Sequence, residues 1–238
     1  RFFSFSDTHR TGLVFKEKVS CGDPEIFYIR AGSAASTLSP ADIESIDFSD
    51  YSAIHMTGIL PALSDTCRQT AFRLKEKAQQ AGLLVSFDPN LRPQLWPNTE
   101  TMRDFMHTFA AGCDLFFPGI GEAQLLTGLT KPQEILDFYC ALGAKTVILK
   151  DGSNGAHYQN ARECGTVSGF QVAVVDTVGA GDGFAAGTLS GLLEKLSLPE
   201  AIRRGNAVGA RQITVPGDNE GLPTREQLQQ FFNQHQEA

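Results

Sequence analysis

From residue 52 to residue 150, short apolar runs alternate with longer amphipathic stretches, and this alternation restricts the chain to few folds. Four apolar runs have the length and composition of buried strands and cover residues 53–60, 83–88, 114–118 and 145–150. Helical periodicity fills the intervals at residues 64–82, 98–111 and 132–142. Strands that are joined by helical crossovers form a mostly parallel sheet with helices on both faces. The sequence therefore predicts a doubly wound α/β fold.

Both ends of the chain add further elements to this core. Residues 11–18 and 25–31 are short aromatic-rich runs around a Cys-Gly-Asp-Pro turn, which is typical of a β-hairpin. A β-rich stretch is expected at 156–175, and helices are expected at 181–195, 199–213 and 225–235. We therefore expect a small β-lid segment over residues 1–35 and one α/β domain over residues 36–238.

Composition excludes several classes of protein. The chain has 20 Lys and Arg against 27 Asp and Glu, a net charge of −7, whereas nucleic-acid binding normally needs a basic excess. No run of 18 apolar residues occurs, so no membrane span is predicted. The 5 cysteines form no CxxC motif. This pattern favours reduced thiols in a cytoplasmic protein over a zinc site or a disulfide framework.

The strongest chemical signal is the glycine-rich segment at 174–188, Val-Val-Asp-Thr-Val-Gly-Ala-Gly-Asp-Gly-Phe-Ala-Ala-Gly-Thr. We expect a strand that runs into Asp176, a glycine turn, and then a helix. Such a turn exposes backbone N–H groups and the positive end of a helix to a phosphate, and Asp182 at the helix start can accept a hydroxyl proton. From the residues alone, a glycine turn with a capping aspartate is an equally good interpretation. Neither GxGxxG nor GxxxxGK[ST] is present, which excludes the Rossmann fingerprint and the P-loop.

The run Asp-Thr-Val-Gly-Ala-Gly-Asp at 176–182, followed by Gly-Phe-Ala-Ala-Gly, resembles the C-terminal signature of the ribokinase-like (PfkB-type) carbohydrate kinases. Stretches at 11–17, 28–36 and 87–96 resemble the 2-keto-3-deoxygluconate kinase branch of that family. The family's N-terminal strand and its Gly-Gly sugar-binding motif have no match. We therefore expect the native chain to begin several tens of residues before Arg1.

The resemblance implies ATP-dependent phosphorylation of a sugar-acid hydroxyl, with Mg²⁺ and a monovalent cation as cofactors. Asp182 matches the catalytic base, which also contacts the substrate, and the backbone of Gly179, Ala180 and Gly181 matches the anion hole. Asp176 matches a position in the cation and metal network. As an alternative, Asp176 is a hydrogen-bond acceptor in the turn before the helix.

Five residues match substrate-binding positions of the family. Asn90 and Arg92 follow the strand at 83–88, and Arg suits a bidentate grip on a carboxylate. Alternation places Tyr28 and Arg30 on one face of a strand, which the resemblance assigns to the lid over the sugar. Asp218 matches an acid in a C-terminal loop. The alternatives are surface arginines paired with nearby acids, a solvated edge strand and an ordinary loop aspartate.

The nucleotide-binding positions lie in the second half of the chain. Lys150, Gly152 and Gly155 match the ATP-binding stretch, together with the glycines of the anion hole, although a plain hairpin turn has a similar sequence. Asn206 matches a position beside the adenine. Glu122 matches a residue that orders Mg²⁺-bound water, but Gly-Ile-Gly-Glu stands at 119–122 where many relatives have Asn-x-x-Glu. A glutamate at a helix start is also favourable in itself.

The leading hypothesis is a kinase of 2-keto-3-deoxygluconate that forms the 6-phosphate. A kinase of fructose, ribose or an inositol-pathway acid is the alternative within the family, and a non-catalytic sugar-acid-binding protein is the alternative outside it. The apolar hairpin at 11–31 needs a partner surface, since a lone two-stranded hairpin is marginal in water. The family's habit of pairing such lids implies a homodimer or larger assembly.

Overall fold

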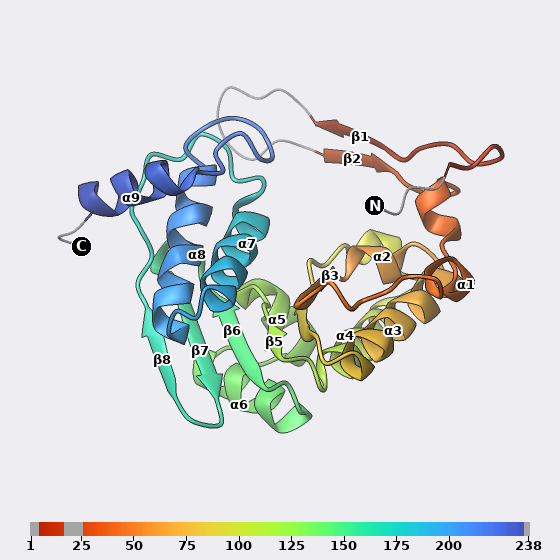
Figure 1. Ribbon diagram of the computed structural model, residues 1–238, viewed down its shortest axis with the longest axis horizontal. Helices are drawn as coiled ribbons and strands as arrows, with labels where there is room; N and C mark the ends of the chain where they lie inside the picture. Colours follow the sequence, from red (N-terminus) through yellow and green to blue (C-terminus); the bar gives the residue numbers. More distant parts are fainter. Residues whose placement is uncertain (1–4, 17–25, 236–238) are drawn as a thin grey trace. The chain divides into compact units, whose positions relative to one another are not determined.

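The structure, a computed structural model, describes residues 5–16 and 26–235 (Figure 1). Its main sheet has six strands in the order β3-β4-β5-β6-β7-β8, and a second sheet contains β1 and β2. The pairs β3–β4, β4–β5 and β5–β6 are parallel, whereas β7–β8 is antiparallel. The predicted α/β fold with a mostly parallel sheet is therefore confirmed. The chain divides into two compact units, of which unit 1 comprises described residues 5–16 and 26–147 and unit 2 comprises residues 148–235.

Unit 1 contains the hairpin and the first part of the main sheet. Its strands are β1 (Leu13–Lys16), β2 (Ile26–Ile29), β3 (Ala53–Thr57), β4 (Leu84–Asp88) and β5 (Leu115–Phe116). Its longer helices are α3 (Asp65–Gln80), α4 (Thr99–Ala110), α5 (Ile120–Thr127) and α6 (Pro132–Leu142). Short helical turns lie at η1 (Ala34–Thr37), α1 (Pro40–Ile43), α2 (Ile59–Ala62) and η2 (Pro93–Leu95). Strand β6 (Thr146–Lys150) begins in unit 1 and ends in unit 2.

Unit 2 contains the end of the sheet and three helices. Its elements are η3 (Gly152–Asn154), β7 (Ala156–Asn160), β8 (Cys164–Val167), α7 (Ala180–Leu193), α8 (Leu198–Gln212) and α9 (Arg225–Gln234). Figure 1 shows α7 and α8 side by side. Glycines allow this close packing, because a Cβ on Gly205 would lie 2.1 Å from the hydroxyl oxygen of Thr188. Helix α9 packs on α8 through Phe231, which contacts Phe170 with 5.1 Å between ring centroids.

Local capping signals explain where several helices begin and end. The hydroxyl of Ser64 accepts the N–H of Cys67 at the start of α3. Asn98 caps α4 in the same way, and Thr224 with Gln227 forms a capping box at the start of α9. Gly143 ends α6 with φ 110°, a left-handed conformation that glycine adopts without strain.

An aromatic core holds the sheet and helices of unit 1 together. The ring of Phe87 on β4 lies 4.6 Å from that of Phe109 on α4, measured between centroids. The ring of Phe116 on β5 lies 4.7 Å from that of Tyr139 on α6. All four side chains are buried. This packing fixes the ends of β4 and β5, from which the loops of the candidate site extend.

The predicted strand that runs into Asp176 is wrong. Within the expected β-rich stretch at 156–175 the strands are only β7 and β8, and residues 168–177 form neither helix nor strand. The N–H groups of Val175 and Asp176 both donate to the carbonyl of Ile213, at 2.8 and 3.2 Å. Because both donors converge on one acceptor instead of alternating along a ladder, the β-branched residues here form an exposed connection.

The turn predicted at 21–24 falls outside the described residues. Over the ranges that the structure does describe, no helix is long and apolar enough to cross a membrane.

Candidate functional site

The candidate residues fall into two groups, one in each unit. Unit 2 contains the predicted base, anion hole and nucleotide-binding residues, together with Asp176 and Asp218. Unit 1 contains Tyr28, Arg30, Asn90, Arg92 and Glu122. Each group has its own internal geometry.

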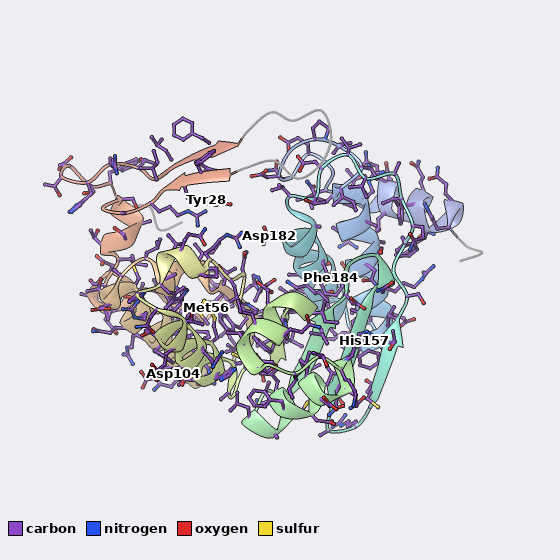
Figure 2. The ribbon with its side chains drawn as sticks, turned by 180° about the vertical axis from the view of Figure 1, so that it is seen from behind. Tyr28, Met56, Asp104, His157, Asp182 and Phe184 are labelled. Carbon is purple, nitrogen blue, oxygen red and sulfur yellow. The ribbon has the colours of Figure 1, made fainter. Side chains whose placement is uncertain are left out.

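The glycine turn in unit 2 leads directly into α7. Gly179 precedes the helix with φ 81°, and Ala180 and Gly181 are its first two residues. Asp182 follows with an exposed side chain at the N-terminal end of α7 (Figure 2). Gly179, at the N-cap position, has no side chain that could cap the helix. The first N–H groups of a helix have no partner within it, so this end can bind an anion beside the Asp182 carboxylate.

The loop that carries Asp218 lies against this turn. A Cβ placed on Gly179 would lie only 2.2 Å from the carbonyl oxygen of Asp218, so no larger residue fits there without a backbone shift. The carboxylate of Asp176 joins the same two segments, because Oδ1 accepts the N–H of Val178 and Oδ2 accepts the N–H of Gly217, each at 3.1 Å. The structure thus brings Asp176, the predicted anion hole and the Asp218 loop together.

A pocket of about 530 Å³ in unit 2 opens beside the start of α7, and this volume is within the usual range for small-molecule sites. The residues that line it include the predicted nucleotide-binding residues Lys150, Gly152, Gly155, Gly181 and Asn206, together with Ala180 of the predicted anion hole. Its apolar wall includes Phe170, Val172, Val174, Phe184 and Ile213. The ammonium nitrogen of Lys150 lies 3.5 Å from the point that a Cβ on Gly181 would occupy. A cation therefore stands over the N-terminus of α7 at one end of a largely apolar pocket.

Asn206 shapes the wall of this pocket. Its side chain is buried, and its amide nitrogen donates to the carbonyls of Val167 and Ser168 at 3.1 and 3.0 Å. The connection after β8 is also packed tightly, because a Cβ on Gly155 would lie 2.0 Å from the carbonyl oxygen of Val167. The side chain of Asn206 is thus hydrogen-bonded to the protein backbone. The resemblance places this residue beside the adenine of ATP.

A cationic cluster in unit 1 combines residues that the sequence placed far apart. The guanidinium carbon of Arg30 lies 4.0 Å from the centre of the Tyr28 ring, and that of Arg92 lies 5.9 Å from the same centre. Burial lowers the pKa of Arg30, Tyr28 opposes this shift, and the neighbouring charge of Arg92 adds to it. Nη1 of Arg30 is buried and has no hydrogen-bond partner among the described residues. We refer to Tyr28, Arg30 and Arg92 as the arginine cluster.

The loop after β4 positions Arg92. Asp88 is buried at the strand end, and its Oδ1 accepts the N–H of Asn90 at 3.1 Å. Asn90 has φ 37°, which is uncommon for a residue other than glycine. Glu122 holds the next residue, because Oε1 accepts the N–H of Leu91 at 2.7 Å while Oε2 accepts the N–H of Gly119 at 2.8 Å. Glu122 therefore braces this loop and starts α5.

Sequence reasoning missed Gln212, the last residue of α8. Its side chain is fully buried and bonds to the glycine turn and to the loop that carries Asp218. The available signal was its position, since Gly205, Val208 and Gly209 on α8 are also buried and lie one or two turns earlier on the same face. A glutamine in a buried stripe must find hydrogen-bond partners.

The described residues contain no group of three or more His, Cys, Asp or Glu side chains that could hold a metal ion. Mg²⁺ in phosphoryl-transfer enzymes is commonly bound by one or two carboxylates together with water and substrate phosphates. The predicted Mg²⁺ role of Glu122 is therefore compatible with its position but stays a prediction.

The model of the pfkB family carbohydrate kinases matches residues 1–225. The chain is 45% identical over 234 residues to a 2-dehydro-3-deoxygluconokinase of Bacillus subtilis, which covers 98% of this chain and 72% of that protein. It resembles the crystal structure of a PfkB protein from Polaromonas, with 43% identity, a TM-score of 0.83 and coverage of 93% and 71% of the two chains.

A fructokinase double mutant from Vibrio cholerae, solved with fructose, ADP and a potassium ion, is 27% identical with a TM-score of 0.85. That match covers 95% of this chain and 74% of the fructokinase.

Proposed function

Because this chain belongs to the pfkB family of carbohydrate kinases, we propose that it transfers the γ-phosphoryl group of ATP to the 6-hydroxyl of 2-keto-3-deoxygluconate. The observation that carries the choice of a sugar acid is the arginine cluster. The relative from Bacillus subtilis, named for the same compound, supports this choice.

The arginine cluster favours an anionic substrate on electrostatic grounds. Two guanidinium groups lie near one tyrosine ring, and the charge of Arg92 adds to the lowering of the pKa of Arg30 that burial causes. A buried N–H donor without a partner costs free energy, and a carboxylate that accepts from it removes that cost. A neutral sugar offers hydroxyl groups but no compensating charge. The cluster therefore selects a substrate that carries a carboxylate.

The start of α7 supplies the groups for phosphoryl transfer. Asp182 accepts the proton of the attacking hydroxyl, and the backbone N–H groups at 179–181 stabilise charge on the phosphoryl oxygens. Lys150, which lies close to the same helix end, neutralises the phosphates of ATP, and the apolar wall of the pocket contacts the adenine ring. Asp218 contacts the sugar, and Asn90 shares this role. Catalysis then rests on positioning and charge stabilisation, as is general for phosphoryl transfer.

Mg²⁺ would supply charge neutralisation at the ATP phosphates, and Glu122 is the residue that would hold its water ligands. Each oxygen of the Glu122 carboxylate accepts one backbone N–H, which leaves lone pairs for water. The sequence pattern of the 5 cysteines favours reduced thiols, and on that ground we place the enzyme in the cytoplasm.

The hairpin of β1 and β2 acts as a lid that also joins two copies of the chain. Its register pairs Leu13 with Ile29 and Phe15 with Phe27, so these four side chains share one face. All four are exposed, Phe15 by 55% and Phe27 by 59%. Tyr28 lies on the opposite face, with the arginine cluster. An apolar face on so small an element favours contact with a second copy, while the other face covers the substrate.

A screen of ADP release against 2-keto-3-deoxygluconate, fructose, ribose and an inositol-pathway acid tests the proposed function. We expect the highest kcat/KM with 2-keto-3-deoxygluconate. A higher kcat/KM with fructose or ribose would assign the enzyme to neutral sugars. Saturable binding of the acid without ADP release would indicate a non-catalytic binding protein.

A further inference from the structure

Gln212 makes three hydrogen bonds that join the glycine turn to the loop carrying Asp218. Its Nε2 donates to the carbonyl of Gly217 at 2.8 Å and to that of Val178 at 3.4 Å. Its Oε1 accepts the N–H of Gly221 at 3.1 Å. The side chain is fully buried, so these contacts are formed away from water.

These three contacts also fix the orientation of the amide. A flipped amide would place its oxygen against two carbonyl oxygens and its nitrogen against the N–H of Gly221. Only the orientation with nitrogen toward Val178 and Gly217 satisfies every partner. The partly positive NH₂ group of Gln212 therefore lies where two backbone carbonyls converge.

Asp176 and Gln212 form a complementary pair of braces. Asp176 accepts the N–H groups of Val178 and Gly217, and Gln212 donates to the carbonyls of the same two residues. One peptide segment from the turn and one from the loop are thus each held by a carboxylate and an amide. These hydrogen bonds also fix the position of Gly179, which lies between Val178 and the first residue of α7.

Converging carbonyl oxygens beside a carboxylate are also suitable ligands for a hard cation. The resemblance assigns Asp176 to a monovalent cation network, and the similar fructokinase was solved with a potassium ion. In this protein the NH₂ group of Gln212 already lies within hydrogen-bond distance of the Val178 and Gly217 carbonyl oxygens. A cation between these two oxygens would therefore be close to the partly positive NH₂ group. A monovalent cation therefore does not fit between these two carbonyls, because the NH₂ group of Gln212 lies there.

We infer that Gln212 is a positioning residue that holds the anion-hole turn with its own amide, so that this kinase needs no monovalent cation. This inference rests on the proposed function for its kinetic consequence. Its structural consequence, a turn whose stability does not depend on potassium, is independent of any activity.

The first experiment compares the wild-type protein in potassium chloride and in choline chloride at equal ionic strength. Choline is too large to replace potassium among backbone carbonyls. We expect kcat to agree between the two salts within about twofold, and the midpoint of thermal unfolding to be the same. A tenfold or larger loss of kcat in choline, or a clear rise of the melting midpoint with potassium, would overturn the inference.

The second experiment changes the donor. Gln212→Glu keeps the shape but turns an oxygen toward both carbonyls, which creates a set of acceptors that needs a cation. We expect this variant to melt at a lower temperature in choline and to recover in potassium, unlike the wild type. Gln212→Ala removes the brace, and we expect kcat to fall by about tenfold or more while KM for ATP changes less. Gln229→Glu, an exposed glutamine on α9, is the matched control.

The outcomes separate this inference from the proposed function. If the protein releases no ADP with any sugar in either salt, the proposed function fails, and the melting curves still test the brace. If Gln212→Glu and the wild type respond equally to potassium, the brace is refuted even in an active kinase. If Gln212→Glu does not fold, the wild-type comparison and Gln212→Ala decide.

Discussion

The glycine turn before α7 and the arginine cluster in unit 1 are stabilised in different ways. The turn is held from within, because Asp176 and Gln212 satisfy both the N–H and the carbonyl of Val178 and of Gly217. The arginine cluster leaves Nη1 of Arg30 without a partner among the described residues and brings two like charges near one ring. The turn that we propose for phosphoryl transfer is therefore preorganised in the free protein, whereas the cluster that we propose for substrate binding keeps a buried donor that a ligand can satisfy.

The largest effect is expected at the residue that the preorganised turn presents. Asp182→Asn removes the proton acceptor and leaves the backbone of the turn unchanged, so we expect kcat to fall by about 10²–10⁴-fold. Binding of ATP, measured by calorimetry, should change little. Asp104→Asn on the exposed face of α4 is the control and should keep full activity. Wild-type turnover in Asp182→Asn would show that Asp182 is not the catalytic base.

The second prediction tests the rigidity of the turn with a pair of glycines. Gly179 and Gly82 both have positive φ, at 81° and 72°, but only Gly179 has backbone within 4 Å of an added Cβ. Gly82→Ala should cost about 1–2 kcal/mol of stability from the left-handed conformation alone. Gly179→Ala should cost about 1–3 kcal/mol more, because the Asp218 carbonyl must move. Urea unfolding measures both values, and equal costs would show that the turn yields easily.

The third prediction addresses the arginine cluster. Arg30→Ala or Arg92→Ala should raise KM for the sugar acid roughly 30-fold, which corresponds to a loss of about 2 kcal/mol of binding free energy. Thermal stability should not fall in Arg30→Ala, since an unpaired buried donor and a like-charge contact are both removed. Arg162→Ala, in the exposed turn after β7, is the control. A large loss of stability together with an unchanged KM would show that the arginine cluster stabilises the fold and does not bind the substrate.

The smallest effect on stability is expected on the outer face of the hairpin. Replacing Phe15 and Phe27 by Ser should convert a dimer to a monomer in light scattering and leave the melting temperature of the monomer unchanged. Both rings are more than half exposed within one chain, so the variant loses little buried surface there. Tyr51→Ser removes an exposed ring elsewhere in unit 1 and should leave the dimer intact. A wild-type monomer with full activity would contradict the proposed assembly.

The part of the fold that the sequence predicted correctly depends on local signals. The caps at Ser64, Asn98 and Thr224, and the stop at Gly143, each act within one helical turn, so a single stretch of sequence contains them. The strand expected before Asp176 failed because strand formation needs a partner, and Val175 instead donates to Ile213 far along the chain.

The candidate site shows the same difference between local signals and contacts between distant segments. The glycine turn and the start of α7 were visible in one continuous motif. The role of Gln212 was not, because its three partners lie on segments that only the fold brings together. The positive φ of Asn90 likewise depends on the contacts of its loop with Asp88 and Glu122.

The alternation of side chains along β2 ties two properties of the protein to a single register. Tyr28 faces one way, and Phe27 and Ile29 face the other. A shift of this strand by one residue against β1 would exchange the two sets of side chains completely. An insertion or deletion of one residue in the hairpin would therefore remove the aromatic ring from the arginines and the apolar residues from the outer surface in the same event. Substrate recognition and subunit association in this kinase are expected to be lost together by such a change and to be separable only by substitution.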